Sequence, residues 1–167
     1  LLVWAGRDGA IIPIARAYAD DLLGTTSQLN LFGRPEASFL TRRTYFNSPR
    51  SSNLLRPGLP ILFYESVRSG GRGAIVAAAR IVDATVLQKS QVPEELLRRA
   101  VVEDVNPLSS STEVLATTFD SLLRFPRVVP LAELRSLGAT TAANFQTSTP
   151  VSAERLAAIL EFGWSSG

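Results

Sequence analysis

The sequence has no cysteine and no histidine. Without cysteine it can form no disulfide, no thiolate nucleophile and no cysteine zinc site. Without histidine it lacks the commonest general base, the serine–histidine and cysteine–histidine nucleophile pairs, and the usual transition-metal ligand. Any catalysis would therefore depend on carboxylate, hydroxyl, tyrosine, lysine or arginine groups.

Methionine is also absent, even at position 1. We therefore expect that the sequence is part of a longer protein, or that it lacks methionines which the natural chain has. Apolar runs break within about a dozen residues, short of the roughly 20 that a membrane span needs. No secretory signal pattern opens the sequence. These absences predict a cytoplasmic protein with no membrane partner.

Length and composition indicate one globular domain. The 167 residues are 46% hydrophobic and 19% charged, enough to bury a core and too apolar for a disordered chain. We expect a single domain over residues 1–167.

The positive charge is concentrated in one segment, although the net charge is only +2. Residues 34–80 hold eight arginines and two acids, a charge of +6, whereas the remainder has nine basic and thirteen acidic residues, a charge of −4. Sixteen of the 17 basic residues are arginine, whose guanidinium suits bidentate phosphate contacts. Codon bias of a GC-rich genome also explains the excess of arginine, but not its clustering. The asymmetry indicates an anionic partner, and nucleic acid first.

Hydrophobic periodicity and turn residues predict the elements. We expect helices over Ala10–Leu23, Val92–Val102, Leu131–Leu137 and Ser152–Phe162. We expect strands over Pro60–Ser66, Gly73–Val82, Leu115–Phe119, Phe125–Val129 and Asn144–Thr147, with a hairpin at Ser69–Gly73 and a turn at Asp120–Ser121. This order lacks the regular alternation of a parallel doubly wound sheet and predicts an α+β fold with a mixed or antiparallel sheet.

Residues 38–57 show no clean period and predict a long structured loop, with a short strand near Leu40–Tyr45. In this segment Tyr45 or Phe46 offers a ring for stacking on a base, and Asn47 or Asn53 can pair with a base edge. The cations for flanking phosphates are Arg42, Arg43, Arg50 and Arg56, with Ser52 among them. The alternative is that the aromatic residues anchor the loop to the core and the arginines face water.

Tyr64 and Ser66 share one face of the predicted strand, opposite Phe63. If Phe63 points into the core, Tyr64 and Ser66 face a cleft. The alternative is a buried tyrosine whose hydroxyl group is satisfied.

Three segments together resemble the PUA-like superfamily, in particular its EVE and ASCH branches. They are Tyr45–Asn47 with Arg50 and Asn53 leading to Leu55–Gly58, then Ile61–Ser66, then Gly73–Val82. The resemblance spans about residues 39–130 and leaves residues 1–35 as a helical N-terminal extension. It departs from the family pattern at Leu59, where the family turn usually has an acid, and at Ala77 or Ala78, where it has glycine.

The resemblance implies a small, mixed or antiparallel PUA-like β-barrel flanked by helices. It also implies recognition of RNA, or of DNA carrying a modified base, with no cofactor and no metal. The site would comprise Arg42, Arg43, Tyr45, Asn47, Arg50, Ser52, Arg56, Tyr64 and Ser66. Two alternatives stay open. One is a hydrolase or nuclease using Glu65 or Asp83 as a carboxylate, with magnesium. The other is an accessory domain fused to, or paired with, a larger transferase or a toxin-like partner.

Overall fold

The computed structural model describes residues 6–23, 42–100, 111–140 and 145–165. The elements in chain order are β1 (Gly9–Ile14), α1 (Arg16–Leu23), β2 (Arg43–Asn47), η1 (Pro49–Ser51), β3 (Pro60–Glu65), η2 (Arg68–Gly70), β4 (Ala74–Gln88), η3 (Lys89–Gln91), α3 (Glu94–Arg98), β5 (Glu113–Pro130), α4 (Leu131–Ser136), β6 (Thr149–Val151) and α5 (Ala153–Trp164). No helix in these ranges is long and apolar enough to cross a membrane.

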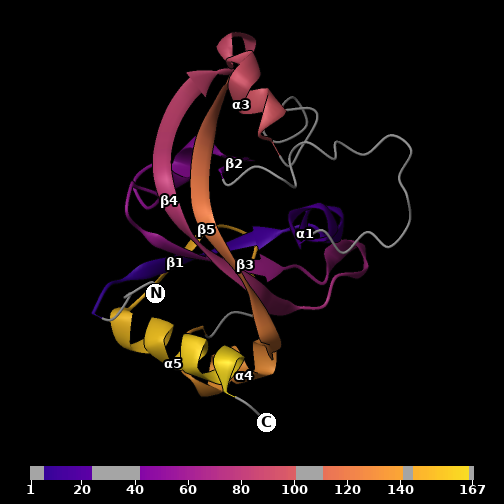
Figure 1. Ribbon diagram of the computed structural model, residues 1–167, viewed down its shortest axis with the longest axis vertical. Coiled ribbons are helices and arrows are strands. Elements are labelled where there is room, and N and C mark those ends of the chain that lie inside the picture. The colour runs from indigo at the N-terminus through magenta and orange to yellow at the C-terminus, as the bar shows by residue number, and fades with distance from the viewer. Residues whose placement is uncertain (1–5, 24–41, 101–110, 141–144, 166–167) are drawn as a thin grey trace.

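The six strands form one mixed sheet in the order β2-β5-β4-β3-β1-β6 (Figure 1). β1 and β3 are parallel, and the other neighbours are antiparallel. The predicted α+β class and mixed sheet are confirmed. The expected closure into a barrel is not found among the described strands, because β2 and β6 are edges that do not pair. A hydroxyl contact of 3.3 Å between Ser51 and Ser148 links the segments beside those two edges.

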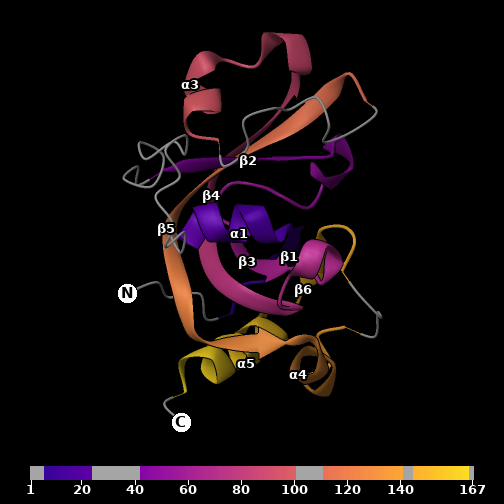
Figure 2. The same ribbon diagram turned by 90° about the vertical axis from the view of Figure 1, so that its right-hand side faces the viewer.

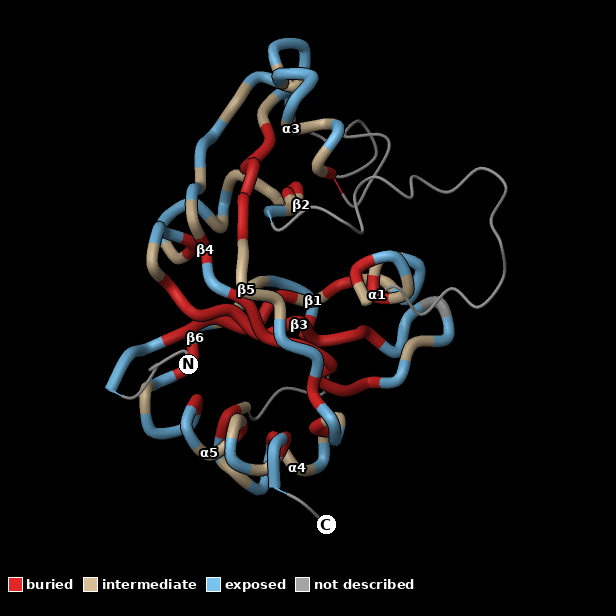
Figure 3. The backbone as a smooth tube through the Cα atoms, in the orientation of Figure 1, coloured by how far each residue is buried: buried red, intermediate tan, exposed pale blue. Residues whose placement is uncertain are grey.

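Both faces of the sheet are covered by apolar cores, and the buried backbone concentrates in its middle (Figure 3). Side chains alternate along β3, so Phe63 joins one core and Tyr64 the other. The first core includes Ala19 and Leu22 of α1, which lies between β2 and the β1–β3 pair (Figure 2). The second core is covered by α4 and α5. A third, smaller core lies between β2, β5 and α3.

The prediction of a helix over Ala10–Leu23 is wrong in its first half. Residues 9–14 form β1, an inner strand between β3 and β6, and α1 begins only at Arg16. Ile12 and Ile14 enter the first core and Ile11 the second. A short apolar run buried on both sides matches helix and strand equally well, so periodicity could not decide. Of residues 1–35, the structure describes 6–23.

Three strand predictions also need correction. Leu115–Phe119 and Phe125–Val129 are one continuous strand, β5, and the turn expected at Asp120–Ser121 is absent. Ser121 has a φ of 54°, and the pairing of β5 with β4 shifts register nearby, so the polar pair marks an irregularity within the strand. β6 begins at Thr149, after the predicted Asn144–Thr147. β2, at Arg43–Asn47, overlaps the strand predicted near 40–45, of which residues 40 and 41 lie outside the described ranges.

The remaining predictions are confirmed in outline. β3 and β4 form the expected antiparallel hairpin, and α4 ends before Gly138, which has a φ of 65°. α5 matches the predicted helix, whereas α3 is shorter than 92–102 in the described part of the chain.

Candidate nucleic-acid interface

Alternate residues of β2 place Arg43, Tyr45 and Asn47 in one row, and the first two hold α1 against the sheet. The Tyr45 hydroxyl donates a hydrogen bond to the Pro13 carbonyl at 3.3 Å, and burial raises the pKa of Tyr45. The Arg43 guanidinium donates to the Leu22 carbonyl, and burial lowers the pKa of Arg43. The exposed stacking ring and phosphate cation expected at these positions are therefore engaged in packing.

Asn47 ends this row, where its Oδ1 accepts a hydrogen bond from the Thr117 hydroxyl at 3.3 Å. Thr117 is fully buried, and Asn47 is half-buried. The Asn47 amide N–H₂ group has no hydrogen-bond partner in the described part of the chain. It is the one polar group of the row that remains able to meet a base edge.

Tyr64 and Ser66 lie away from the β2 row. Tyr64 is fully buried in the core under α4 and α5, where its ring lies 4.8 Å from that of Phe145, centroid to centroid. Burial raises the pKa of Tyr64, and the charge of Arg135 opposes this. Ser66 is buried and accepts a hydrogen bond from the Arg68 backbone at 3.3 Å. Helices cover the expected cleft at Tyr64, and neither side chain faces solvent. The alternative of a buried tyrosine is confirmed for the ring, but the prediction of a satisfied hydroxyl group is wrong, because the Tyr64 hydroxyl has no hydrogen-bond partner in the described part of the chain.

Glu65 and Asp83, the alternative catalytic carboxylates, lie on two neighbouring strands, Glu65 at the end of β3 and Asp83 within β4. Glu65 is 1% exposed and pairs with Arg72, with 2.6 Å between Oε2 and Nε. Asp83 is exposed and accepts a hydrogen bond from Thr85 at 3.0 Å. Glu65 is in register with Ala74, nine residues before Asp83, a length of roughly 30 Å of strand. The two candidates thus differ in setting: Glu65 is buried and paired, whereas Asp83 is exposed.

The exposed candidates gather in the connection between β2 and β3, residues 48–59. Arg50, Ser52 and Arg56 are exposed there. Neither arginine side chain makes a hydrogen bond or ion pair within the described part of the chain. Arg42, just before β2, is also exposed, and its charge adds to the lowering of the Asp120 pKa that Arg80 mainly causes.

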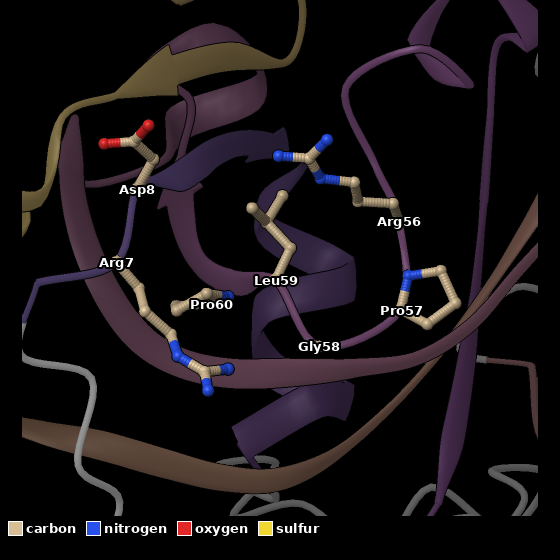
Figure 4. A pocket seen from close by; sticks show the side chains of 7 residues that line it. All are labelled: Arg7, Asp8, Arg56, Pro57, Gly58, Leu59 and Pro60. Atoms are coloured by element: carbon tan, nitrogen blue, oxygen red, sulfur yellow. The ribbon is translucent and has the colours of Figure 1, made fainter.

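The connection borders a surface notch of about 260 Å³, shown in Figure 4. Its lining residues are Arg7, Asp8, Arg56, Pro57, Gly58, Leu59 and Pro60. Arg56, Pro57 and Gly58 belong to a segment that carried the family resemblance, whereas nothing in the sequence pointed to Arg7 or Asp8. Their place became visible only because β1 and β3 pair in parallel, which brings the segments before both strands side by side.

No family model matches the sequence, and no curated protein matches it. Solved structures do match. The ASCH protein from Zymomonas mobilis has a TM-score of 0.67 at 12% identity, covering 92% of this chain and 94% of that chain. A tyrosine-to-phenylalanine variant of it has a TM-score of 0.68 at 11% identity, covering 93% and 98%. The human THYN1 protein, in complex with DNA containing 5-methylcytosine, has a TM-score of 0.55 at 14% identity, covering 96% and 100%. The chain therefore has the PUA-like fold of ASCH-domain proteins.

Proposed function

We propose that this protein is a nucleic-acid-binding domain that contacts a strand through the exposed arginines of residues 42–59. One observation carries the proposal. Between Glu36 and Glu65 the sequence holds four arginines and no acid. Of these, Arg50 and Arg56 are exposed without a side-chain partner among the described residues. An exposed guanidinium that forms no ion pair is ready to replace the counterions of a phosphate backbone.

Exposure divides the residues of the site into those that contact nucleic acid and those that hold the surrounding elements in place. Arg42, Arg50, Ser52 and Arg56 lie on the surface and are the contact residues. Arg43, Tyr45, Tyr64 and Ser66 hold the elements beneath them in place. Asn47 offers its amide N–H₂ group to a base edge. Base-specific contacts would be few, so phosphate contacts would supply most of the affinity.

The fold supports nucleic acid as the ligand, because the human protein that shares it was solved with DNA containing 5-methylcytosine. RNA and modified DNA are the two ligands to compare. Because most of the expected contacts are to phosphates, we expect this chain to bind both RNA and modified DNA. Any preference between them would be small and would arise from base contacts near Asn47.

The test is fluorescence anisotropy with labelled single-stranded RNA, DNA and 5-methylcytosine DNA between 50 and 200 mM salt. The wild-type affinity should fall steeply with salt, and the double variant Arg50→Ala/Arg56→Ala should lower the log–log slope by about 0.7–0.9 per lost phosphate contact. Arg124→Ala removes one exposed charge from β5 and is the control for the single variants Arg50→Ala and Arg56→Ala, measured beside the double variant.

The control should leave the salt slope unchanged. A wild-type protein that binds none of the three strands, or binds them independently of salt, would overturn the proposal. An equal loss in the control and the single variants would show that net charge, not this segment, determines binding.

A further inference from the structure

The notch beside the β2–β3 connection lies where the chain enters two parallel strands. Gly9 at the start of β1 packs so closely on the start of β3 that a Cβ there would lie 2.9 Å from the Pro60 carbonyl oxygen. Leu59 and Pro60 are buried and form an apolar floor. The volume, about 260 Å³, is below the 300–1,000 Å³ typical of drug-sized ligands. The notch is therefore too small to enclose more than one sugar or base.

Two cations stand on either side of this floor. Figure 4 shows the guanidinium groups of Arg7 and Arg56 extending past opposite sides of Leu59 and Pro60. Both residues are exposed, and within the described ranges neither side chain has a hydrogen-bond or ion-pair partner. They come from different segments, so their juxtaposition depends on the fold.

The one carboxylate of the notch is turned elsewhere. Asp8 Oδ1 accepts a hydrogen bond from the Ala153 backbone N–H at 3.0 Å, at the first turn of α5. Ser152, the N-cap residue, makes no side-chain cap hydrogen bond, so Asp8 performs that role. Asp8 thus forms no ion pair with the two arginines, and the notch keeps a net charge of +1.

The backbone of the floor offers no donor to a ligand. The Gly58 N–H donates to the Ile81 carbonyl at 2.8 Å, and the Leu59 N–H donates to the Arg56 carbonyl at 3.1 Å. Pro57 and Pro60 have no N–H. The floor therefore supplies only contact, and the two guanidinium groups are the cationic donors of the notch.

We infer that the notch takes one nucleotide unit of a bound strand, with Arg7 and Arg56 contacting the phosphates on its two sides. The apolar floor lies under the sugar or base between them. This inference rests on the proposed function and adds Arg7, from a segment outside the arginine-rich region, to the binding surface. The recognised chemistry is a nucleoside carrying two phosphates, as an internal unit of a strand or as a free bisphosphate.

The first test uses small ligands and does not require binding of a strand. A nucleoside 3′,5′-bisphosphate should bind more tightly than the 5′-monophosphate, by about 3- to 10-fold for one added phosphate contact, as judged by NMR titration of arginine Nε–H signals. Arg7→Ala and Arg56→Ala should each remove that advantage. Asp8→Asn retains the helix cap and should strengthen bisphosphate binding, because it removes the nearby negative charge.

The second test uses oligonucleotides in which one phosphate at a time is replaced by a neutral methylphosphonate. Replacing either of two adjacent phosphates should weaken binding by the wild-type protein. Arg7→Ala should be insensitive to one of these two replacements, and Arg56→Ala should be insensitive to the other. Equal affinity for bisphosphate and monophosphate, or an undiminished advantage in Arg7→Ala, would overturn the inference. Bisphosphate binding without oligonucleotide binding would uphold the notch and overturn the proposed function.

Discussion

The β3–β4 turn (residues 66–73) and the β2–β3 connection (residues 48–59) each carry two arginines between strands of one sheet. In the turn, Arg72 pairs with buried Glu65 through both its backbone N–H and its side chain. Arg16 of α1 also donates to the Gly70 carbonyl at 2.9 Å. Arg68 of the turn, like Arg50 and Arg56 of the connection, has no such side-chain partner in the described part of the chain. Whether a carboxylate lies beside an arginine, and not the arginine alone, distinguishes a structural cation from one that can bind an anion.

The largest effect on stability is expected from replacing a glycine in the turn, compared with replacing a glycine in the connection. A Cβ on Gly71 in the turn would lie 1.9 Å from the Ser66 carbonyl oxygen, so backbone must move. Gly71→Ala should lower the free energy of unfolding by about 3 kcal/mol or more. Gly58 in the connection has a φ of 83° and open space, so Gly58→Ala should cost about 1–2 kcal/mol from backbone strain alone. Urea unfolding of both variants measures this, and equal losses would contradict the packing argument.

The next effect concerns the buried pair of the turn. Arg72→Ala leaves Glu65, 1% exposed, without its cation. Because the Arg72 side chain is 39% exposed, water reaches part of the pair. The loss should therefore be about 2 kcal/mol, below the 3–5 typical of fully buried pairs. The double variant Glu65→Gln/Arg72→Ala should regain part of it, since no charge is left buried. A double variant less stable than Arg72→Ala would show that charge burial is not the cause.

A smaller effect is expected at the Arg80–Asp120 ion pair on the sheet surface. Its arginine is paired, as Arg72 is in the turn, but exposed, as the arginines of the connection are. Two hydrogen bonds, at 3.1 and 2.9 Å, join the pair and lower the pKa of Asp120. A carboxyl group with a lowered folded pKa stabilises the fold above its unfolded value near 4, and this is lost as the pH falls through the folded value. Asp120→Asn should therefore destabilise slightly at pH 6, and the difference in unfolding free energy from wild type should shrink steadily as the pH is lowered below about 4, as urea unfolding across this range would measure.

The smallest effect on stability is expected in the connection itself. Arg50→Ala/Arg56→Ala removes only exposed side chains, so the free energy of unfolding should stay within about 0.5 kcal/mol of wild type. Thermal and urea unfolding check this with the same samples used for binding. A loss comparable to that of Arg72→Ala would mean that these arginines are structural as well.

Local signals in the sequence predicted much of the fold. The alternation around Phe63 and Tyr64, the glycine-rich hairpin and the helix after Ser152 were all strong enough to identify. The helical prediction failed at Ile11 and Ile14, because burial on both sides removes the periodicity that distinguishes a strand. The turn prediction at Asp120–Ser121 failed because a polar pair marks a strand irregularity as readily as a chain reversal.

The site was less predictable than the fold. Alternation correctly placed Tyr64 opposite Phe63, but it could not show that α4 and α5 cover the second face as well. Charge clustering identified Arg50 and Arg56, but it could not separate them from Arg72, whose partner Glu65 lies on the neighbouring strand. Arg7 gave no local signal in the sequence. It lies near Arg56 only because β1 and β3 pair in parallel, which a local pattern cannot reveal.

The hydrogen bond from Ala153 to Asp8 joins positions 145 residues apart in the chain. During synthesis on the ribosome, β1 emerges long before β6 and α5, its partners on one side. Until α5 docks, Asp8 is available to neutralise the guanidinium groups beside it. A contact between residues so far apart in the sequence forms slowly during folding. The net positive charge of the notch therefore depends on the docking of α5 as well as on the two arginines.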